Sequence, residues 1–579
     1  MKKNAQLFFA LIFILFASCE RDIDTISSTV EDAEKEAIND LGNVDDHYDI
    51  DDYSWDTNAI LFVEMDESGF TAVGEGIGIS GSTLTISKAG TYSFSGELSD
   101  GQLIVDTEDA GLVRIILNGV SIHSNSTSPV SITNTKRTMI VLADGTENVI
   151  SDGPSYSSGE DGPNATIYSA DDLTFYGNGS LTVNANYNDG ITSKDGLIIS
   201  SGKIIVNAAD DGIRGKDYLV IQNGIITVNA GGDALKSDND EDEAKGYISI
   251  ADGTINLTSE GDGIAAFTDV VIDYGLITIQ SGGGSNQSTS STSSKGIKAG
   301  VFITINDGSI TIDAADDAIH SDTDITILNG YFAIASGDDG IHSEYNTVIS
   351  AGDIHITKSY EGLESALGSV TIIGGTFQIV ASDDGINISA GGAPSGGGPG
   401  QKSATATSDC ALNISGGYLV INNEGDGLDS NNAMDITGGT MIVNSAEYNE
   451  NSSIDCDGIC KIDGGTVIGI GVSQMAQAPG TTSGQYSVLI NFKTRVAKGI
   501  LIHVEDSEGN SILTCTSIKS FNSFVCSSAG FKNGSTYKLY IGGSSSGTVV
   551  DGLYSNGTYS GGTLYTSFTI SSKITTKTI

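Results

Sequence analysis

Asp189-Gly190-Ile191, Asp211-Gly212-Ile213 and Asp233-Ala234-Leu235 are copies of one phrase, and each copy starts 22 residues after the one before. Seven further copies or variants start at residues 262, 295, 317, 339, 361, 384 and 426. The longer intervals hold insertions: an acidic one at 238–243, a Ser/Gly-rich one at 282–294 and a small-residue one at 391–408. A fixed period of this kind indicates a stack of like structural units.

Each repeat holds three short runs that are typical of β-strands. Examples are the runs 219–221 and 225–228, in which β-branched residues are bounded by Gly, Asp and Asn. One such three-stranded repeat cannot bury its apolar side alone, whereas stacked copies about 4.8 Å apart bury it continuously. The sequence therefore predicts an all-β protein with a right-handed parallel β-helix of about 22 residues per repeat.

The boundaries follow from where this pattern starts and stops. We expect the β-helix over residues 76–480, with irregular first turns at 76–180 and regular repeats at 181–470. From 481 to 579 the strands become longer, as in 488–492, which predicts a small antiparallel β domain that caps the stack. Cys515 and Cys526 flank an expected hairpin there and are the best candidates for a disulfide.

The N-terminus predicts export and anchoring. Lys2 and Lys3 precede an apolar stretch at 7–16, and Ala17-Ser18-Cys19 follows. This pattern resembles a bacterial lipoprotein signal, which implies removal of residues 1–18, lipidation of Cys19, an acidic tether over 19–75 and display on the cell envelope, at the outer membrane and facing outward. The alternative is an ordinary secretory signal with an incidental cysteine.

The charge balance of the chain limits the kinds of molecule that it can bind. The chain has 27 Lys and Arg against 74 Asp and Glu, a formal net charge of −47. Such a balance argues against nucleic acid and against electrostatic attachment to anionic membranes. We therefore expect the membrane to be reached through the lipid anchor alone, and the chain to be a monomer.

Stacking turns the first residue of each phrase into an acid column along the stack. Bare carboxylates about 4.8 Å apart repel by roughly 3.5 kcal/mol at an effective dielectric constant of 20, and Ca²⁺ midway lies at a suitable distance of about 2.4 Å from each. The alternative is turn chemistry, in which each carboxylate accepts N–H groups of its own turn. The candidate calcium ligands, with preceding acids and the acidic insertion, are Asp189, Asp210, Asp211, Asp233, Asp238, Asp240, Asp242, Asp262, Asp316, Asp317, Asp338, Asp339, Glu361, Asp383 and Asp384.

The residue after each Ile or Leu faces away from the core and forms an outward column. Its members are Thr192, Arg214, Lys236, Ala265, Lys298, His320, His342, Glu364, Asn387 and Asp429. Cations on this stripe favour a groove for a polymer that carries carboxylates, with Arg214, Lys236, Lys298, His320, His342, Tyr360 and Glu364 as candidate carbohydrate contacts. The alternative is ion pairing with the acid column, for which Lys295 is the simplest counter-ion.

Several long phrases resemble a known family. The phrases at 232–247, 294–299, 315–321, 337–343 and 358–365 are similar to those of the bacterial carbohydrate-binding β-helix family. That family is similar to pectate lyases in fold, contains calcium and binds cellulose-like and polygalacturonate polymers. The resemblance, which covers roughly residues 75–570, implies calcium-dependent carbohydrate binding here.

Three functions compete at this point. The first is calcium-dependent binding of a plant-type acidic polysaccharide, without catalysis. The second is a pectate-lyase-like enzyme, in which Arg214, Lys236 or Lys298 takes the α-proton of a uronate if its pKa is depressed. The third is a structural or adhesive rod without a specific glycan.

Overall fold

The protein is described by a computed structural model that covers residues 50–157, 162–287, 292–390, 410–448 and 451–579. The predicted signal peptide, Cys19 and the tether up to residue 49 lie outside the described residues. Within the described part the helices are two short 3₁₀ turns, η2 (Ile50–Tyr53) and η3 (Thr57–Ala59), and the remaining regular structure is β-strand. Among these residues no helix has the length and apolar character needed to cross a membrane.

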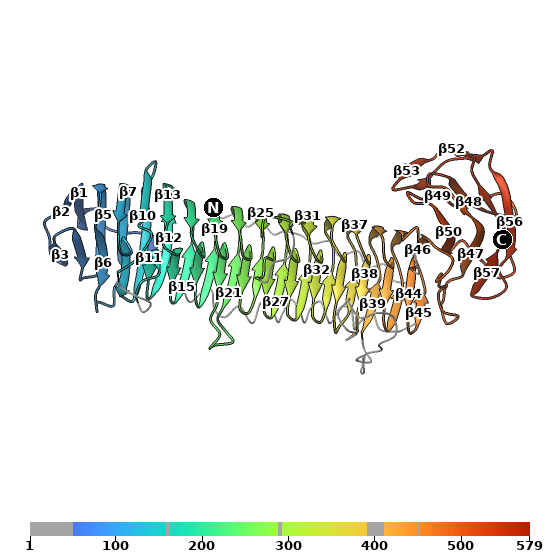
Figure 1. The fold of residues 1–579 in the computed structure, drawn as a ribbon, viewed down its shortest axis with the longest axis horizontal. Helices are drawn as coiled ribbons and strands as arrows, with labels where there is room; N and C mark the ends of the chain where they lie inside the picture. Colours follow the sequence, from blue (N-terminus) through green and yellow to red (C-terminus); the bar gives the residue numbers. More distant parts are fainter. Residues whose placement is uncertain (1–49, 158–161, 288–291, 391–409, 449–450) are drawn as a thin grey trace, which may run out of the picture. The chain divides into compact units, whose positions relative to one another are not determined.

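A sheet of 16 strands contains every strand that begins within a copy of the repeated phrase (Figure 1). Apart from the antiparallel β3–β4 pair, neighbouring strands in it are parallel, and those from β14 on join successive repeats. The strands are β3 (Ile77–Ser80), β4 (Thr83–Ile86), β6 (Gln102–Asp106), β8 (Val130–Asn134), β11 (Ala165–Ser169), β14 (Asp189–Ser193), β17 (Ile213–Gly215), β20 (Leu235–Ser237), β23 (Ile264–Ala266), β26 (Ile297–Ala299), β29 (Ile319–Ser321), β32 (Ile341–Ser343), β35 (Leu363–Ser365), β38 (Ile386–Ile388), β41 (Leu428–Ser430) and β44 (Ile454–Cys456).

The other two strands of each repeat belong to a sheet of 33 strands, in which they form two parallel rows. The first row is β9 (Arg137–Leu142), β12 (Asp172–Gly177), β15 (Gly196–Ile199), β18 (Tyr218–Ile221), β21 (Tyr247–Ile250), β24 (Val270–Ile272), β27 (Phe302–Ile305), β30 (Asp324–Ile327), β33 (Thr347–Ile349), β36 (Val370–Ile372), β39 (Ala411–Ile414), β42 (Ala433–Ile436) and β45 (Cys460–Ile462).

The second row is β10 (Glu147–Asp152), β13 (Ser180–Ala185), β16 (Lys203–Ala208), β19 (Ile225–Ala230), β22 (Thr254–Ser259), β25 (Leu276–Ser281), β28 (Ser309–Ala314), β31 (Tyr331–Ser336), β34 (Asp353–Lys358), β37 (Thr376–Ala381), β40 (Tyr418–Asn423), β43 (Thr440–Asn444) and β46 (Thr466–Gly471). The long strand β7 (Val113–Ser124) pairs with both β9 and β10, so both rows meet in it. Each regular repeat therefore contributes three short strands, as the sequence predicts.

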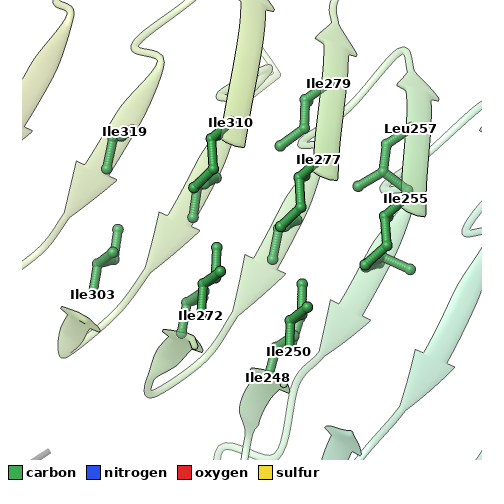
Figure 2. Close-up of a cluster of buried hydrophobic side chains, with 14 of the residues drawn as sticks. Ile248, Ile250, Ile255, Leu257, Ile272, Ile277, Ile279, Ile303, Ile310 and Ile319 are labelled. Carbon is green, nitrogen blue, oxygen red and sulfur yellow. The ribbon is translucent and has the colours of Figure 1, made fainter. Parts of the chain in front are cut away.

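Equal period places the apolar residues of successive repeats in register. Ile191, Ile213 and Leu235 are direct neighbours across β14, β17 and β20, and Ile319 and Ile341 are neighbours across β29 and β32. All of these side chains are fully buried in one continuous core, to which all three rows contribute. Figure 2 shows part of this core, with isoleucines from the three rows in one interior.

The glycine of the phrase is required by close packing. A Cβ atom at Gly263 would lie 2.3 Å from Cγ2 of Ile279 and 2.6 Å from the carbonyl oxygen of Gly296 in the next repeat. Such distances are far inside van der Waals contact, so a side chain there would push the repeats apart. This explains why Asp is followed by Gly in most copies of the phrase.

The strands begin before the boundary expected at residue 76. Strand β1 (Ile60–Asp66) runs parallel to β5 (Gly90–Leu98), β5 runs parallel to β7, and β2 (Gly69–Ala72) pairs antiparallel with β1. Val63 and Met65 on β1 are buried in the common core. The sequence analysis assigned this strand to the acidic tether, because its buried residues alternate with the exposed acids Glu64 and Asp66.

The C-terminal region changes to mainly antiparallel pairing. Strand β50 (Phe521–Ser527) pairs antiparallel with β46 and with β47 (Ser487–Val496), and β47 is parallel to β57 (Ile574–Thr578). A six-stranded sheet contains β53 (Thr548–Val550), β54 (Leu553–Ser555), β49 (Ser511–Thr516), β48 (Leu501–Asp506), β51 (Thr536–Ile541) and β56 (Thr563–Thr569). A two-stranded sheet contains β52 (Ser544–Ser545) and β55 (Tyr559–Ser560).

The expected disulfide between Cys515 and Cys526 is not formed. Both are free, buried thiols. The strands that carry them, β49 and β50, belong to different sheets and do not form the expected hairpin. The prediction was wrong because β49 and β50, although consecutive in the chain, pair with other strands.

Candidate functional site

The acid column is held by the backbone of the neighbouring repeat. One oxygen of most of its carboxylates accepts the N–H of the column member one repeat further on. The turn-chemistry alternative had placed this bond within the carboxylate's own turn. These N–H to Oδ1 bonds run from Asp233 to Asp211 (2.9 Å), Asp262 to Asp233 (2.8 Å), Lys295 to Asp262 (2.7 Å), Asp339 to Asp317 (3.0 Å), Glu361 to Asp339 (3.0 Å) and Asp426 to Asp384 (2.6 Å).

The second carboxylate oxygen meets the outward column, whose member stands three residues later. Lys236 Nζ lies 2.8 Å from Asp233 Oδ2 and 3.0 Å from Asp211 Oδ2. His320 Nδ1 lies 2.8 Å from Asp317 Oδ2, and Thr192 Oγ1 donates to Asp189 Oδ2 at 2.9 Å. In this half of the stack the two columns therefore neutralise one another, as the ion-pairing alternative supposes.

Among the described residues, three groups of side chains bring potential metal-ligand atoms within 4.8 Å of one another, and they comprise Asp316, Asp317 and Asp338; Asp317, His320 and His342; and Asp339, His342 and Glu364. Lys295 occupies the first group, with Nζ 2.6 Å from Asp317 and 3.1 Å from Asp316. Asp210 and Asp383 precede the column at its edge; Asp210 is exposed and Asp383 half-buried.

The acidic insertion is not gathered into a group of this kind in the described structure. Asp238 is engaged by the guanidinium of Arg214, through Nε at 3.0 Å and Nη2 at 2.6 Å. Asp240 and Asp242 are exposed, and Asp242 Oδ1 accepts the N–H of Ala244 at 3.1 Å. The insertion thus borders the stack and supplies a partner for Arg214.

Beyond His342 the outward column loses its cations. Glu364, Asn387 and Asp429 follow, and the described residues include no Lys or Arg salt bridge to this stretch of either column. Asn387 Nδ2 donates to both oxygens of Glu361, at 3.0 and 2.9 Å. Apart from Glu364, which meets His342, the carboxyl groups between Glu361 and Asp429 therefore have no Lys, Arg or His partner among the described side chains.

Burial raises the pKa of most carboxyls in the acid column, including Asp211 and Asp262 beside the lysines. Burial, with Asp383 and Asp426 nearby, raises the pKa of Asp384 to about 8, and burial beside Glu364 and Asp339 raises that of Glu361 to about 10. Burial and the neighbouring Asp384 and Asp426 also raise the pKa of Asp429 well above its usual value. In contrast, His320 and Lys295 outweigh burial at Asp317 and lower the pKa of its carboxyl.

The two predicted histidines are neighbours. The rings of His320 and His342 are 4.8 Å apart, and both pKa values are raised, because nearby carboxylates outweigh the effect of burial; that of His342 reaches about 11. Tyr360, a candidate carbohydrate contact, is half-buried, and its backbone N–H donates to the carbonyl oxygen of Asp338 at 2.7 Å.

A cleft of about 840 Å³ lies over β20, β23 and β26. Lys236, Ala265 and Lys298 are in-register neighbours on these strands, so the small Ala265 leaves a hollow between two lysines. The lining also includes acid-column carboxylates and parts of the insertions; its acidic members are Asp210, Asp211, Asp233, Asp238, Glu260, Asp262 and Asp322. The cleft thus combines cations with hydrogen-bond acceptors.

The cleft also contains an aromatic residue that the sequence analysis did not identify. Phe267 lines the cleft and is 51% exposed. It stands three residues after Ile264, a position occupied by Asp238, Asp322 and Glu344 in other repeats. A large aromatic in a column of polar residues was the available signal.

The three candidate lyase bases differ in how tightly neighbouring carboxylates hold their positive charge. Burial opposes the charge of Lys236, but Asp233 and Asp211 outweigh it and raise the pKa. The same balance, with Asp238 and Asp189 as partners, raises the pKa of Arg214. Both shifts are opposite to what a proton-abstracting base needs. Lys298, which lies 4.0 Å from Asp262, is the loosest of the three cations.

Comparisons with known proteins find similarity to proteins described as carbohydrate-binding. A family model described as carbohydrate-binding domain-containing protein matches residues 80–340. A carbohydrate-binding domain-containing protein from Acetivibrio thermocellus is 39% identical over 156 residues, which is 26% of this chain and 54% of that protein, so the chain spans about half the length of this curated relative. The solved polysaccharide lyase-like protein from C. thermocellum, a gadolinium derivative, is 36% identical; the match covers 38% of this chain and 92% of that chain, with a TM-score of 0.38.

Proposed function

We propose that the cleft between Lys236 and Lys298 binds an acidic, polygalacturonate-like polysaccharide without cleaving it. The observation that carries the proposal is the presence of a loosely paired ammonium, Lys298, and an exposed aromatic ring, Phe267, in one cleft. The ammonium attracts a uronate carboxylate, and the ring packs against the apolar face of a sugar. The family match supports the ligand class, since residues 80–340 include the whole lining of the cleft.

Calcium is the second part of the proposal. A chain with a net charge of −47 repels a polyuronate, so a bridging cation is needed in addition to two lysines. The carboxyl groups of Glu361, Asp384, Asp426 and Asp429, which have no Lys, Arg or His partner among the described side chains, are hard oxygen ligands of the type that Ca²⁺ prefers. We therefore propose that Ca²⁺ bound along the column lowers the repulsion and strengthens polysaccharide binding.

Binding to polygalacturonate, with and without a chelator, tests both parts. Lys298→Gln should weaken binding by about tenfold, the equivalent of about 1.4 kcal/mol. Lys203→Gln is the matched control, because Lys203 is an exposed lysine on β16, in the other sheet. Equal losses in both variants would contradict the cleft, and full binding in chelator would contradict the calcium bridge. Release of unsaturated product would show a lyase instead.

We also propose a closed form and a right-handed winding for the stack of repeats. Three parallel rows around one apolar core favour a closed right-handed parallel β-helix, because parallel strands connected in sequence cross over with a right hand in nearly all proteins. A crystal structure in which the chain winds with a left hand, or leaves one side of the core open, would contradict this.

We further propose that a lipid on Cys19 anchors the chain, as a monomer, to the outward face of the outer membrane. The support is the resemblance of residues 1–19 to a lipoprotein signal. Cys19→Ser should move the protein from the membrane fraction to the soluble fraction, and protease should reach the wild-type protein on intact cells. A membrane-bound Cys19→Ser variant would contradict the anchor.

A further inference from the structure

Asp339, His342 and Glu364 converge on the outward face of the 16-stranded sheet. His342 on β32 and Glu364 on β35 are in-register neighbours, and Asp339 precedes His342 by three residues in the turn before β32. His342 Nδ1 lies 2.9 Å from Asp339 Oδ2 and 3.1 Å from Glu364 Oε2. Three side chains from two adjacent repeats thus direct potential ligand atoms to one point.

The spacing of these atoms suits a small divalent cation. All three atoms lie within 4.8 Å of one another, and two of the separations are close to 3 Å. Zn²⁺ binds His nitrogen and carboxylate oxygen at about 2.0 to 2.2 Å. An ion placed just above the plane of the three atoms reaches such distances with small side-chain shifts.

This group contains two carboxylates but only one imidazole. The single N–H on Nδ1 of His342 is shared between two carboxylates, whereas a divalent cation would balance both and accept the lone pair of a neutral imidazole. The neighbouring His320 differs, because Nδ1 faces Asp317 at 2.8 Å and Nε2 faces Asp322 at 3.0 Å, one carboxylate for each nitrogen. The group around His342 is therefore the one in which two carboxylates face a single imidazole nitrogen.

We propose that Asp339, His342 and Glu364 form a binding site for a divalent transition-metal ion, with Zn²⁺ as the best match. A nitrogen ligand beside two carboxylates favours Zn²⁺ over Ca²⁺, which prefers oxygen alone. His342 Nε2 is buried without a hydrogen-bond partner, and Glu344 Oε1, 3.9 Å away, would accept its N–H after a small side-chain shift and so orient a metal-bound ring.

The site is open to a further ligand. The side chains of His342 and Glu364 remain 16% and 17% exposed, so water or an external carboxylate can reach the ion. The outward column leads from Lys298 through His320 to His342, which places the ion on the same face as the cleft. The metal site is argued from its own ligands and does not rest on the proposed polysaccharide function.

Titration of the full metal-free chain with Zn²⁺ by calorimetry, and with Co²⁺ by its visible absorption, tests the site. We expect one tight equivalent and a Co²⁺ spectrum with a nitrogen ligand. Glu364→Gln, which preserves side-chain volume, and His342→Gln should each weaken binding by more than about tenfold. His355→Gln is the matched control, because His355 also lies beside a carboxylate, Asp353 at 3.0 Å, but on β34 of the other sheet.

Absence of a tight equivalent in the wild-type chain would overturn the proposal. So would equal weakening in His342→Gln and His355→Gln, which would indicate unspecific binding to histidines. If His342→Gln fails to fold by circular dichroism, Glu364→Gln decides alone. Tighter binding of Ca²⁺ than of Zn²⁺ at this position, insensitive to His342→Gln, would also contradict a transition-metal site.

Discussion

The backbone N–H of Asp339 donates to Oδ1 of Asp317, 3.0 Å away and one repeat earlier in the chain. The same bond links Asp233 to Asp211 and Asp426 to Asp384. A neutral amide oxygen is also an acceptor and can retain this bond, although without the added strength that the carboxylate charge gives it. The bond that joins the repeats and the charge that the column carries can therefore be changed separately.

Asp317→Asn should destabilise the protein. The amide retains an oxygen for the N–H of Asp339 but loses the ionic contacts with Lys295 at 2.6 Å and His320 at 2.8 Å. Removing one partner of a buried ion pair leaves uncompensated charge and costs about 3 kcal/mol. Urea unfolding at pH 7 should show a lower midpoint, and an unchanged midpoint would mean that these ion pairs contribute nothing to stability.

Asp384→Asn should have the opposite effect in alkaline solution. The pKa of Asp384 is raised from 3.8 to about 8 in the folded chain by burial and by Asp383 and Asp426, so folding favours the protonated carboxyl. The contribution of this group to stability is thus complete below about pH 4 and is lost as the pH rises through about 8. The amide avoids that loss.

In the presence of chelator, Asp384→Asn should therefore raise stability at pH 8 by about 1 to 2 kcal/mol and change it little at pH 4. This gain in stability is smaller than the full pKa shift of Asp384 implies, because the carboxyl is half-buried and partly screened by water. Unfolding midpoints measured across this range test the sign. Destabilisation at pH 8 would show that the charge of Asp384 is compensated by a group or ion other than the described side chains.

Phe267→Ala should weaken polygalacturonate binding while leaving stability unchanged. The side chain is 51% exposed, so its removal creates no cavity, and the loss of an aromatic contact of about 1 kcal/mol corresponds to about a fivefold rise in Kd. Tyr274→Ala is the control, because Tyr274 is 58% exposed and outside the lining of the cleft. Equal effects of the two substitutions would remove Phe267 from the binding surface.

The sequence predicted the stack more reliably than the chemistry of its surface. A phrase repeated every 22 residues aligns Ile319 with Ile341, because register follows from the period alone. The partner of each carboxylate does not follow from the period, since a lysine, an N–H of the next repeat and a metal ion all satisfy the same oxygen. Lys295 was foreseen as a counter-ion because it stands within the column itself. Phe267 was missed because a single aromatic has no period.

Cys515 and Cys526 should remain unreactive in the folded protein. Both thiols are buried, and burial raises the pKa of Cys515 to about 12 and that of Cys526 still further above its usual value. Cys456 is also buried, with 4% of its surface exposed, but it is the internal control because its hydrogen bond with Cys460 lowers its pKa to about 7 and so favours the reactive thiolate. Alkylation followed by mass spectrometry should label Cys456 first, and Cys515 and Cys526 after unfolding without any reducing agent. If these two thiols are labelled in the unfolded chain only after reduction, they are bonded to each other, and the separation of β49 from β50 into two sheets would have to be revised.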